Sequence, residues 1–335
     1  MKVAITYNIK KGAIPPGVPS DLYAEWDDEG TIEAIRQALA SRYEATLIEA
    51  DENAYRKLRA ERPDLVFNIA EGLRGESRES HIPAILEMLQ IPYTGSGPLT
   101  LALCLDKVRA KEVLGYHSIP TPRFFVVNSP LTTHHSPLSF PLIVKPLSEG
   151  SSKGIRDNSV VWDEDGLKER VEWVVREYKQ AALVEEFLQG REFTVALLGN
   201  ERDLKVLPII EIDYSTLTQG VKPIYSYEAK WIWDRPEAPL NIFICPAILE
   251  ECLREEIEDI CRRAFHILNV KDWCRIDLRL DSNGKPNILE LNPLPGILPN
   301  PQDNSCFPKA ARCAGMDYST LINTVVDIAC KRYRI

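Results

Sequence analysis

Apolar and polar residues alternate with a period of two in two segments near the C-terminus, residues 273–280 and 286–292. This alternation predicts two β-strands, each with one apolar and one polar face. Asn283-Gly284 between them favours a two-residue type I′ turn, because both residues tolerate a positive φ. The strands are therefore expected to pair as a hairpin, with three residues pointing into the core: Ile276, Leu289 and Leu291.

The polar face of this predicted hairpin brings four functional groups together. Its register sets Asp277 opposite Glu290 and Arg275 opposite Asn292. Two facing carboxylates repel each other, so the pair requires a cation. Two acids and an amide supply the oxygen ligands that Mg²⁺ prefers in proteins. The alternative is a polar surface on which an arginine pairs with an acid.

The N-terminal part of the chain alternates between strand and helix patterns. Short apolar runs at Val3–Tyr7, Thr46–Ile48 and Leu65–Ile69 predict strands. Thr31–Arg42 and Ser80–Leu89 repeat apolar residues at helical spacing. We expect a small parallel sheet covered by helices, which is an α/β unit.

The remaining patterns predict a middle section and a larger α+β unit. In the middle section we expect helices Lys107–Tyr116 and Leu167–Tyr178 and strands Phe124–Val127, Phe140–Pro146, Ser159–Trp162 and Leu183–Phe187. Besides the hairpin, the larger unit is expected to hold strands Phe193–Leu198, Val206–Ile212 and Ile242–Cys245 and helices Ala247–Leu268, Pro308–Ala314 and Tyr318–Lys331.

A small, glycine-rich loop follows the predicted strand that ends at Lys145-Pro146. It reads Glu149-Gly150-Ser151-Ser152-Lys153-Gly154. Such a loop can bring backbone N–H groups and hydroxyls up to phosphate oxygens, while lysines supply charge. It is not a P-loop, because it lacks Gly-Lys-Ser/Thr and leads toward another strand. A flexible surface turn is the alternative.

Composition narrows the class of protein. A chain of 335 residues exceeds what one core usually serves, so two or three subdomains are expected. The net charge of -9 argues against a nucleic-acid-binding surface, which would be basic. No apolar run reaches transmembrane length, and the N-terminus is expected to be a strand rather than a signal peptide. Eight scattered cysteines without a C-x-x-C pair fit reduced thiols in the cytoplasm.

The order of the motifs carries a family resemblance. They run Lys107, Lys145-Pro146, Glu149-Gly150-Ser151-Ser152-Lys153-Gly154, Glu185-Glu186, Glu192-Phe193-Thr194-Val195, Glu228-Ala229-Lys230, Arg275-Ile276-Asp277, Glu290-Leu291-Asn292 and Pro295-Gly296. Taken together, they resemble the ATP-grasp superfamily and, within it, the D-alanine–D-alanine ligase family, as a diverged member. The resemblance implies a three-domain ATP-grasp fold with an α/β substrate domain (1–100), a central lid domain with the glycine-rich loop (101–188) and a C-terminal domain with the hairpin (189–335).

The resemblance also implies a role for each matched residue. ATP is expected to bind Lys107, Lys145, Glu149, Gly150, Ser151, Ser152, Glu185, Glu186, Leu188, Glu192 and Lys230. Mg²⁺, or Mn²⁺ in its place, is expected at Asp277, Glu290 and Asn292. Arg275 and the Gly296 N–H match the donors to an oxyanion, and Ser151 is counted with the catalytic residues. The implied reaction is ATP-dependent joining of a carboxylate to an amine through an acyl phosphate.

The match weakens at the positions that choose the substrates. Glu71 stands where the family usually has the histidine of a His-Gly pair, and Trp231 replaces the usual tyrosine. Residues 293–305 differ from the family pattern after Asn292, and Glu25 is only a candidate for the glutamate that reads the first amino acid. We therefore expect substrates other than D-alanine, namely other amino acids. A genuine D-alanine–D-alanine ligase and a non-catalytic nucleotide-binding protein remain alternatives. The family implies a homodimer, with neither nucleic acid nor membrane as partner.

Overall fold

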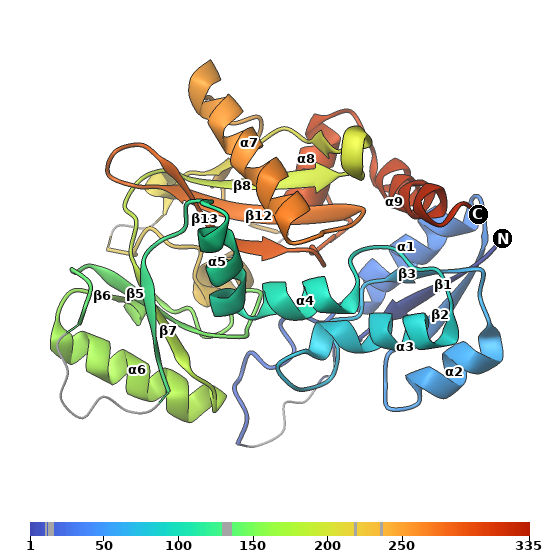
Figure 1. Ribbon diagram of the computed structural model, residues 1–335, viewed down its shortest axis with the longest axis horizontal. Coiled ribbons are helices and arrows are strands. Elements are labelled where there is room, and N and C mark those ends of the chain that lie inside the picture. The colour runs from blue at the N-terminus through green and yellow to red at the C-terminus, as the bar shows by residue number, and fades with distance from the viewer. Residues whose placement is uncertain (11, 13–16, 129–135, 218–219, 235–236) are drawn as a thin grey trace.

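Three β-sheets organise the chain in space (Figure 1). The computed structural model describes residues 1–10, 12, 17–128, 136–217, 220–234 and 237–335. Each sheet lies within one of the three predicted segments. Within the described ranges, no helix is long and apolar enough to cross a membrane.

The N-terminal sheet is parallel, as the sequence predicts, with strand order β2-β1-β3. Its elements are β1 (Lys2–Tyr7), α1 (Glu29–Ala40), β2 (Glu44–Glu49), α2 (Ala54–Glu61), β3 (Leu65–Asn68) and α3 (His81–Leu89). Helix α1 begins where the Asp28 side chain accepts a hydrogen bond from the Thr31 N–H at 2.7 Å, which caps the first turn. Two helices were not predicted: α2, and α4 (Pro98–Leu105) beyond this sheet.

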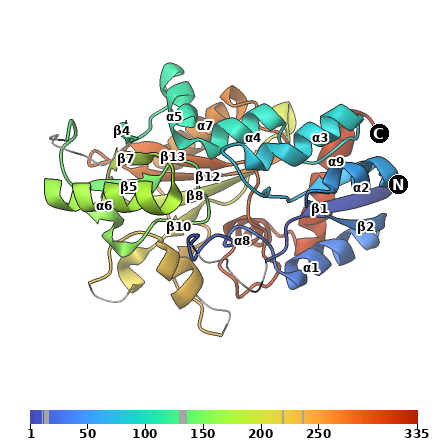
Figure 2. The same cartoon turned by 90° about the horizontal axis from the view of Figure 1, so that it is seen from below.

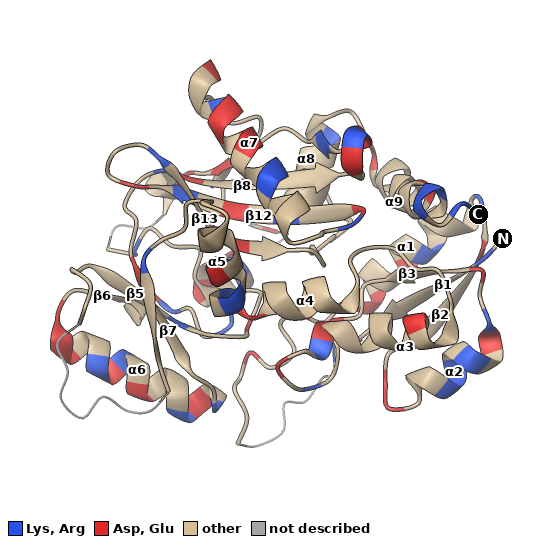
Figure 3. Cartoon of the chain, viewed as in Figure 1, with Lys and Arg blue, Asp and Glu red and all other residues tan. Residues whose placement is uncertain are grey.

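The central domain is a four-stranded antiparallel sheet in the order β4-β7-β5-β6, flanked by one long helix. Its elements are α5 (Lys107–Tyr116), β4 (Phe124–Val127), β5 (Leu142–Pro146), β6 (Val160–Val161), α6 (Glu164–Tyr178) and β7 (Ala182–Glu186). The predicted strand at 159–162 is therefore shorter, since Asp157–Ser159 forms a 3₁₀ turn. Lys and Arg are interspersed with Asp and Glu along α6 (Figure 3).

The C-terminal sheet has the order β11-β10-β8-β12-β13, with β9 paired to β8. Its elements are β8 (Glu192–Leu198), β9 (Lys205–Val206), β10 (Ile210–Ile212), β11 (Phe243–Ile244), α7 (Glu251–Ile267), β12 (Trp273–Leu280), β13 (Pro286–Asn292), α8 (Cys306–Cys313) and α9 (Tyr318–Tyr333). Helices α4, α5 and α7 lie on one side of this sheet and α8 on the other (Figure 2). Helix α9 packs against α1, so the first and last domains share one core.

Two C-terminal predictions were wrong in detail. The strand expected over Val206–Ile212 is two strands, because Pro208 cannot donate to a ladder and interrupts the run. The long helix begins at Glu251 rather than Ala247, whose N–H instead donates to the carbonyl of Ile209 at 2.8 Å.

The hairpin has the predicted register at its functional end but a different turn. Asp277 pairs with Glu290 and Arg275 with Asn292. The turn contains three residues, Ser282–Gly284, because the Asp281 N–H donates to the Lys285 carbonyl at 2.9 Å.

A β-bulge restores the register of the hairpin. Leu278 pairs with Ile288, which leaves Leu289 as the extra residue. The prediction that Leu289 points into the core was wrong: Ile288 is buried there, whereas Leu289 lies on the wall of the cavity described below.

Candidate active site

A cavity of about 230 Å³ lies where the three domains meet. Its walls include the N-terminal segments around Glu25 and Glu71, the glycine-rich loop, the β7–β8 connection and the polar face of the hairpin. Every residue that the sequence analysis assigned to nucleotide binding, metal binding or catalysis lies on this one surface. Residues far apart in the sequence are thus brought together, although their roles stay predictions.

The hairpin contributes a dense set of charges to the cavity. Arg275 Nη2 lies 2.9 Å from Asp277 Oδ2, and Asn292 Nδ2 donates to the same oxygen at 3.2 Å. Lys107 Nζ lies 3.6 Å from Glu290 Oε2. Burial disfavours the charged form of Glu290, but Lys107 and Arg275 outweigh burial and lower its pKa to about 2. Glu290 is therefore an anion in the physiological range.

These hairpin side chains fit a divalent cation. Asp277 and Glu290 face each other on adjacent strands, which places two carboxylates on one polar face with the Asn292 amide beside them. Asn292 presents Nδ2 to both acids, at 3.2 Å and 3.5 Å, so the amide would turn to offer Oδ1 to a metal. This all-oxygen donor set matches Mg²⁺ or Mn²⁺.

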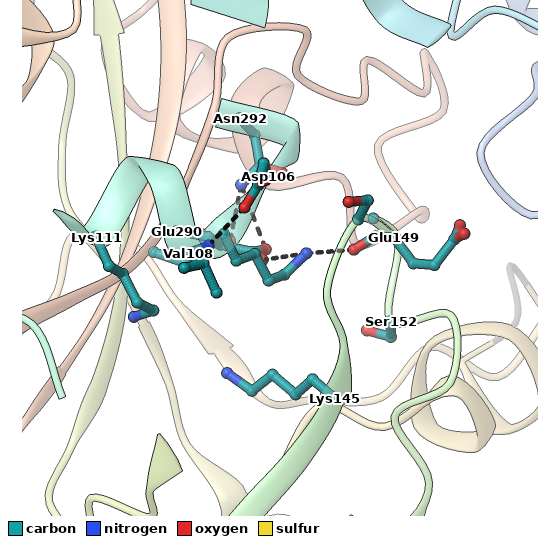
Figure 4. A network of polar contacts seen from close by, with 12 residues as sticks. Asp106, Val108, Lys111, Lys145, Glu149, Ser152, Glu290 and Asn292 are labelled. Carbon is teal, nitrogen blue, oxygen red and sulfur yellow. Dashed lines mark hydrogen bonds and ion pairs between the residues drawn. The ribbon is translucent and has the colours of Figure 1, made fainter. Parts of the chain in front are cut away.

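Lysines from two elements of the central domain, α5 and β5, lie in the same region (Figure 4). Lys107 donates to the backbone carbonyl of Glu149, which joins α5 to the glycine-rich loop. Lys145 at the end of β5 and Lys111 on α5 turn their amino groups toward the same space, 2.5 Å and 2.7 Å from the Glu185 carboxylate. The sequence analysis missed Lys111, although its spacing of four residues from Lys107 puts both lysines on one helix face.

The segment 185–188 presents its backbone rather than its acidic side chains. The Glu185 carboxylate is buried between the two lysines, and Glu186 pairs with Arg123. The backbone edge and Leu188 remain on the cavity wall. This arrangement is compatible with the predicted adenine-contacting role, which depends on backbone groups.

Arg279 on β12 is a buried wall residue that sequence reasoning missed. Its Nη1 lies 3.0 Å from Glu192 Oε2, and its guanidinium lies 4.7 Å from the centre of the Phe187 ring. Burial raises the pKa of Glu192, and Arg279 opposes that shift. Arg279 therefore holds the predicted ribose-binding carboxylate in place. The signal was available, since Arg279 shares a strand face with Arg275 and Asp277.

Thr194 is a second missed wall residue, on β8 next to Asp277. Its Oγ1 is buried and, among the described residues, has no hydrogen-bond partner. A buried hydroxyl without a partner costs on the order of 1–3 kcal/mol, so a ligand atom is its natural partner. Nothing in the sequence marked it, because threonine is common in ordinary strands.

The glycine-rich loop is held from both sides of the cavity. Glu25 of the N-terminal domain accepts from the Gly150 N–H at 2.7 Å and from Lys153 at 3.0 Å. On the other side, Trp231 Nε1 donates to the Ser151 carbonyl at 3.0 Å. Gly154 has a φ of +70°, and a Cβ there would lie 2.3 Å from the Pro146 ring, so only glycine fits. The loop is closed over the cavity.

These contacts argue against Glu25 as the reader of an amino acid's ammonium group. Its carboxylate also accepts from Arg78 at 2.9 Å, so it already has two cationic partners and one backbone donor. Burial opposes its ionisation, but Lys153 and Arg78 outweigh burial and lower its pKa to about 2. The structure assigns Glu25 to holding the loop.

The far end of the cavity, toward the N-terminal domain, is acidic. Asp27, Glu71 and Glu79 line it together with Glu25. Burial raises the pKa of Asp27 and of Glu79 to about 7, and burial and the neighbouring Glu79 raise the pKa of Glu71 well above its usual value. A carboxyl group with a raised pKa lacks sufficient positive charge around it.

Near the hairpin, the wall is completed by two further segments. Lys230 lies close to Arg275, and burial followed by Arg275 lowers its pKa to about 8. Ser305 Oγ donates to the Gly296 carbonyl at 3.1 Å and accepts from the Leu298 N–H at 3.1 Å. These bonds hold the turn that carries Gly296 beside the polar face of the hairpin.

The comparisons with known proteins agree with this architecture. Residues 117–327 match the family model described as "D-ala D-ala ligase C-terminus". A D-alanine–D-alanine ligase from Pelotomaculum thermopropionicum is 34% identical over 310 residues, which cover 89% of this chain and 91% of that protein. An uncharacterized protein of Sinorhizobium fredii, y4sG, is 40% identical over 269 residues, covering 80% of this chain and 75% of that protein.

A solved structure shares the whole fold. The D-alanine–D-alanine ligase from Bacillus anthracis, complexed with ATP, superposes with a TM-score of 0.74 over 100% of this chain and 99% of that chain, at 23% identity. The family model and the 34% identical relative carry the assignment beyond the fold. The chain belongs to the D-alanine–D-alanine ligase family of ATP-grasp enzymes, and it is a ligase that forms carbon–nitrogen bonds with ATP and Mg²⁺.

Proposed function

We propose that the protein joins a carboxylate to an amine through an acyl-phosphate intermediate, with amino-acid substrates other than a pair of D-alanines. The observation that carries this proposal is the position of Arg275 next to Asp277 and Glu290, on the cavity wall that also holds Gly296. A protein that only bound ATP would not need an oxyanion donor beside its metal ligands.

The first step forms the acyl phosphate. A substrate carboxylate oxygen attacks the γ-phosphorus of ATP, and the bond to the bridging oxygen breaks to release ADP. Lys107, Lys145 and Lys230 are placed to neutralise phosphate charge. Asp277, Glu290 and Asn292 would hold Mg²⁺, which when bound stabilises charge on the transferring phosphoryl group.

The second step forms the amide. The amine nitrogen attacks the acyl carbon, phosphate leaves with the electron pair of the C–O bond, and the amine's surplus proton leaves with phosphate. Arg275 and the Gly296 N–H are positioned as donors to the tetrahedral oxyanion, and losing one such donor typically costs about 3 kcal/mol. Ser305 contributes by holding the Gly296 turn.

The closed glycine-rich loop protects the intermediate. Glu25 and Trp231 hold the segment Gly150–Ser151 over the cavity. This closure excludes water, which would otherwise hydrolyse the acyl phosphate. Ser151 and Ser152 lie on the inner wall, where backbone N–H groups and hydroxyls can meet phosphate oxygens.

Altered substrate positions support a change of substrate. Glu71 and Trp231 lie on the cavity wall, as do Asn304 and Ser305 from the region that departs from the family pattern. A pocket's polar groups set specificity, because a buried group left unpaired costs about 1–3 kcal/mol. The second candidate is a genuine D-alanine–D-alanine ligase, which the names of the relatives favour.

One experiment separates these candidates. Phosphate release from ATP and Mg²⁺ is measured across single and paired amino acids, including D-alanine, with mass spectrometry of the products. A D-alanine dipeptide would overturn the change of substrate, and another condensation product would support it. Bound ATP with no stimulation by any acid or amine would overturn the ligase mechanism.

We also propose that the enzyme acts in the cytoplasm as a homodimer. All eight cysteines are free thiols, as a reducing compartment requires. The dimer is a family-level inference. Light scattering of the purified protein tests it directly, and a monomer mass at all concentrations would reject it.

A further inference from the structure

The acidic end of the cavity holds more negative charge than its protein partners neutralise. Its carboxylates are Glu25, Asp27, Glu71, Glu79 and Glu149. Arg78 and Lys153 pair with Glu25 and Glu149, which accounts for two of the five. Lys10 is the cation that lowers the pKa of Asp27. Glu71 and Glu79 are left without an ion-pair or hydrogen-bond partner for their carboxylates within the described parts of the chain.

The backbone forces these two glutamates to be neighbours. The chain leaves β3 and turns at Gly72, whose φ is +84°. A Cβ on Gly72 would lie 2.2 Å from the Arg78 carbonyl oxygen, so the segment between them folds back on itself. The Asn8 side chain accepts from the Gly72 N–H at 2.8 Å and holds the turn against β1. Glu71 and Glu79 therefore enter the cavity wall from the two arms of one loop.

This arrangement is costly in the free protein. Two half-buried carboxylates repel each other, and the nearby cations, chiefly Arg78, do not outweigh burial and the neighbouring acids. In contrast, the hairpin end neutralises Asp277 and Glu290 with Arg275 and Lys107. A ligand that brings positive charge to Glu71 and Glu79 removes the repulsion, so these side chains match a cationic part of the substrate.

The number of positive charges on the substrate distinguishes a basic amino acid from a neutral one. The α-ammonium group of a neutral amino acid compensates one carboxylate, whereas two unpaired carboxylates match two positive charges. The Trp231 ring offers no competing cation site, because Lys10 and Lys230 already lie over it at 4.6 Å and 5.3 Å from its centre. The single carboxylate of the same substrate has its partner in Arg275 at the other end.

We propose that Glu71, together with Glu79, is a specificity-determining residue that binds the cationic side chain of a basic amino acid, the substrate whose carboxylate is phosphorylated. This inference rests on the proposed ligase function and names the class of its first substrate. An amine or guanidine side chain is required, and the neutral amino acids used by the named relatives lack one. The charged group is recognised at the N-terminal end while the carboxylate meets the phosphate-transfer machinery.

The test uses matched pairs that differ only in side-chain charge. Phosphate release is measured with lysine against norleucine, ornithine against norvaline and arginine against citrulline, in both enantiomers and with the same panel of amines. We expect kcat/KM to be about 10- to 100-fold higher for a cationic member, the worth of one charge-assisted contact. Equal or faster turnover of the neutral members would overturn the inference while leaving the ligase intact.

Calorimetric titration separates this inference from the ligase mechanism. The same six amino acids are titrated into the protein with ADP and Mg²⁺ present. Binding of a cationic member, lost in Glu71→Gln, supports the inference even if turnover needs an amine outside the panel. If no cationic member binds or turns over, the inference is wrong whatever the mechanism.

Variants of Glu71 and Glu79 test which side chain causes the preference for cationic substrates. Glu71→Gln is expected to bring the cationic-to-neutral ratio of kcat/KM near one, while the KM for ATP changes less than about twofold. Glu76→Gln is the control, because Glu76 lies exposed in the same loop and should leave the ratio unchanged. A ratio that survives Glu71→Gln and Glu79→Gln alike would overturn the assignment.

Discussion

The hairpin end of the cavity and its N-terminal end differ in charge and in the structure that carries it. At the hairpin end, the acids Asp277 and Glu290 are neutralised by Arg275 and Lys107, and most of the groups lie on paired strands. At the N-terminal end, Glu71 and Glu79 have no ion-pair partner among the described residues and lie on the loop and the 3₁₀ turn that follow β3. We propose that the first end carries out the chemistry common to the family and that the second end selects the substrate.

The largest effect is expected from Arg275→Ala. If Arg275 stabilises the oxyanion, turnover should fall by two or more decades while the affinity for ATP stays within several-fold. Steady-state kinetics and nucleotide titration measure the two quantities. Arg254→Ala, an exposed arginine on α7, is the control and should match the unsubstituted enzyme. Unchanged turnover in Arg275→Ala would remove this residue from the mechanism.

A smaller effect with a distinct signature is expected from Asp277→Asn. The substitution removes one anionic ligand, so activity should drop by about tenfold or more at low Mg²⁺ and recover in part at high Mg²⁺. A titration of activity against Mg²⁺ concentration measures this. If the two proteins respond identically at every Mg²⁺ concentration, Asp277 is not a ligand.

Glu25→Gln tests whether the contact between Glu25 and the glycine-rich loop serves the ligation chemistry or the choice of substrate. Losing the ion pairs with Arg78 and Lys153 should loosen the glycine-rich loop and admit water. We expect ATP hydrolysis without product to rise several-fold relative to ligation. The ratio of phosphate released to amide formed is the readout, with exposed Glu29→Gln as control. A ratio that stays at one would show that Glu25 does not seal the site.

The smallest effect is expected in stability, at the acidic end. Because the pKa of Glu79 is raised to about 7 in the folded protein, its ionisation destabilises the fold as pH rises from about 4.5 to about 7. Glu79→Gln should raise the free energy of unfolding at pH 8 by on the order of 1–3 kcal/mol. At pH 4, where the carboxyl is protonated in both states, the two proteins should be equal. Denaturant titrations at both pH values measure this, and a loss of stability at pH 8 would contradict the unpaired state of Glu79.

The same contrast explains what the sequence could predict. Alternation along β12 and β13 predicts which residues share a face, so the pairing of Asp277 with Glu290 could be read directly. The sequence could not predict the bulge at Leu289. The turn is one residue longer than predicted, and the extra residue in β13 compensates for it, so the pairing of Asp277 with Glu290 is the same with or without the bulge. Helix α4 was missed since its run Pro98–Leu105 is apolar almost throughout and has no helical periodicity.

Contacts between residues far apart in the sequence were the second feature that the sequence could not predict. Glu25 was a reasonable candidate for binding an ammonium group because it is a glutamate in an acidic segment. Its partner Lys153 lies 128 residues away, and no local pattern announces that contact. Arg279 and Lys111 differ from Glu25, because strand alternation and helix spacing placed them beside predicted site residues even though each pairs with a carboxylate on another element. Domain boundaries and residue roles stay predictions.

The packing of α9 has a consequence for engineering the family. The last helix of the chain leaves its own domain and buries residues against α1, with Asn323 donating to the carbonyl of Ala38 at 2.9 Å. The N-terminal domain is therefore completed by residues of α9. A hybrid that takes a relative's first hundred or so residues must also take that relative's final helix, because the two were shaped as one interface. Exchange of substrate specificity in this enzyme is a two-segment graft.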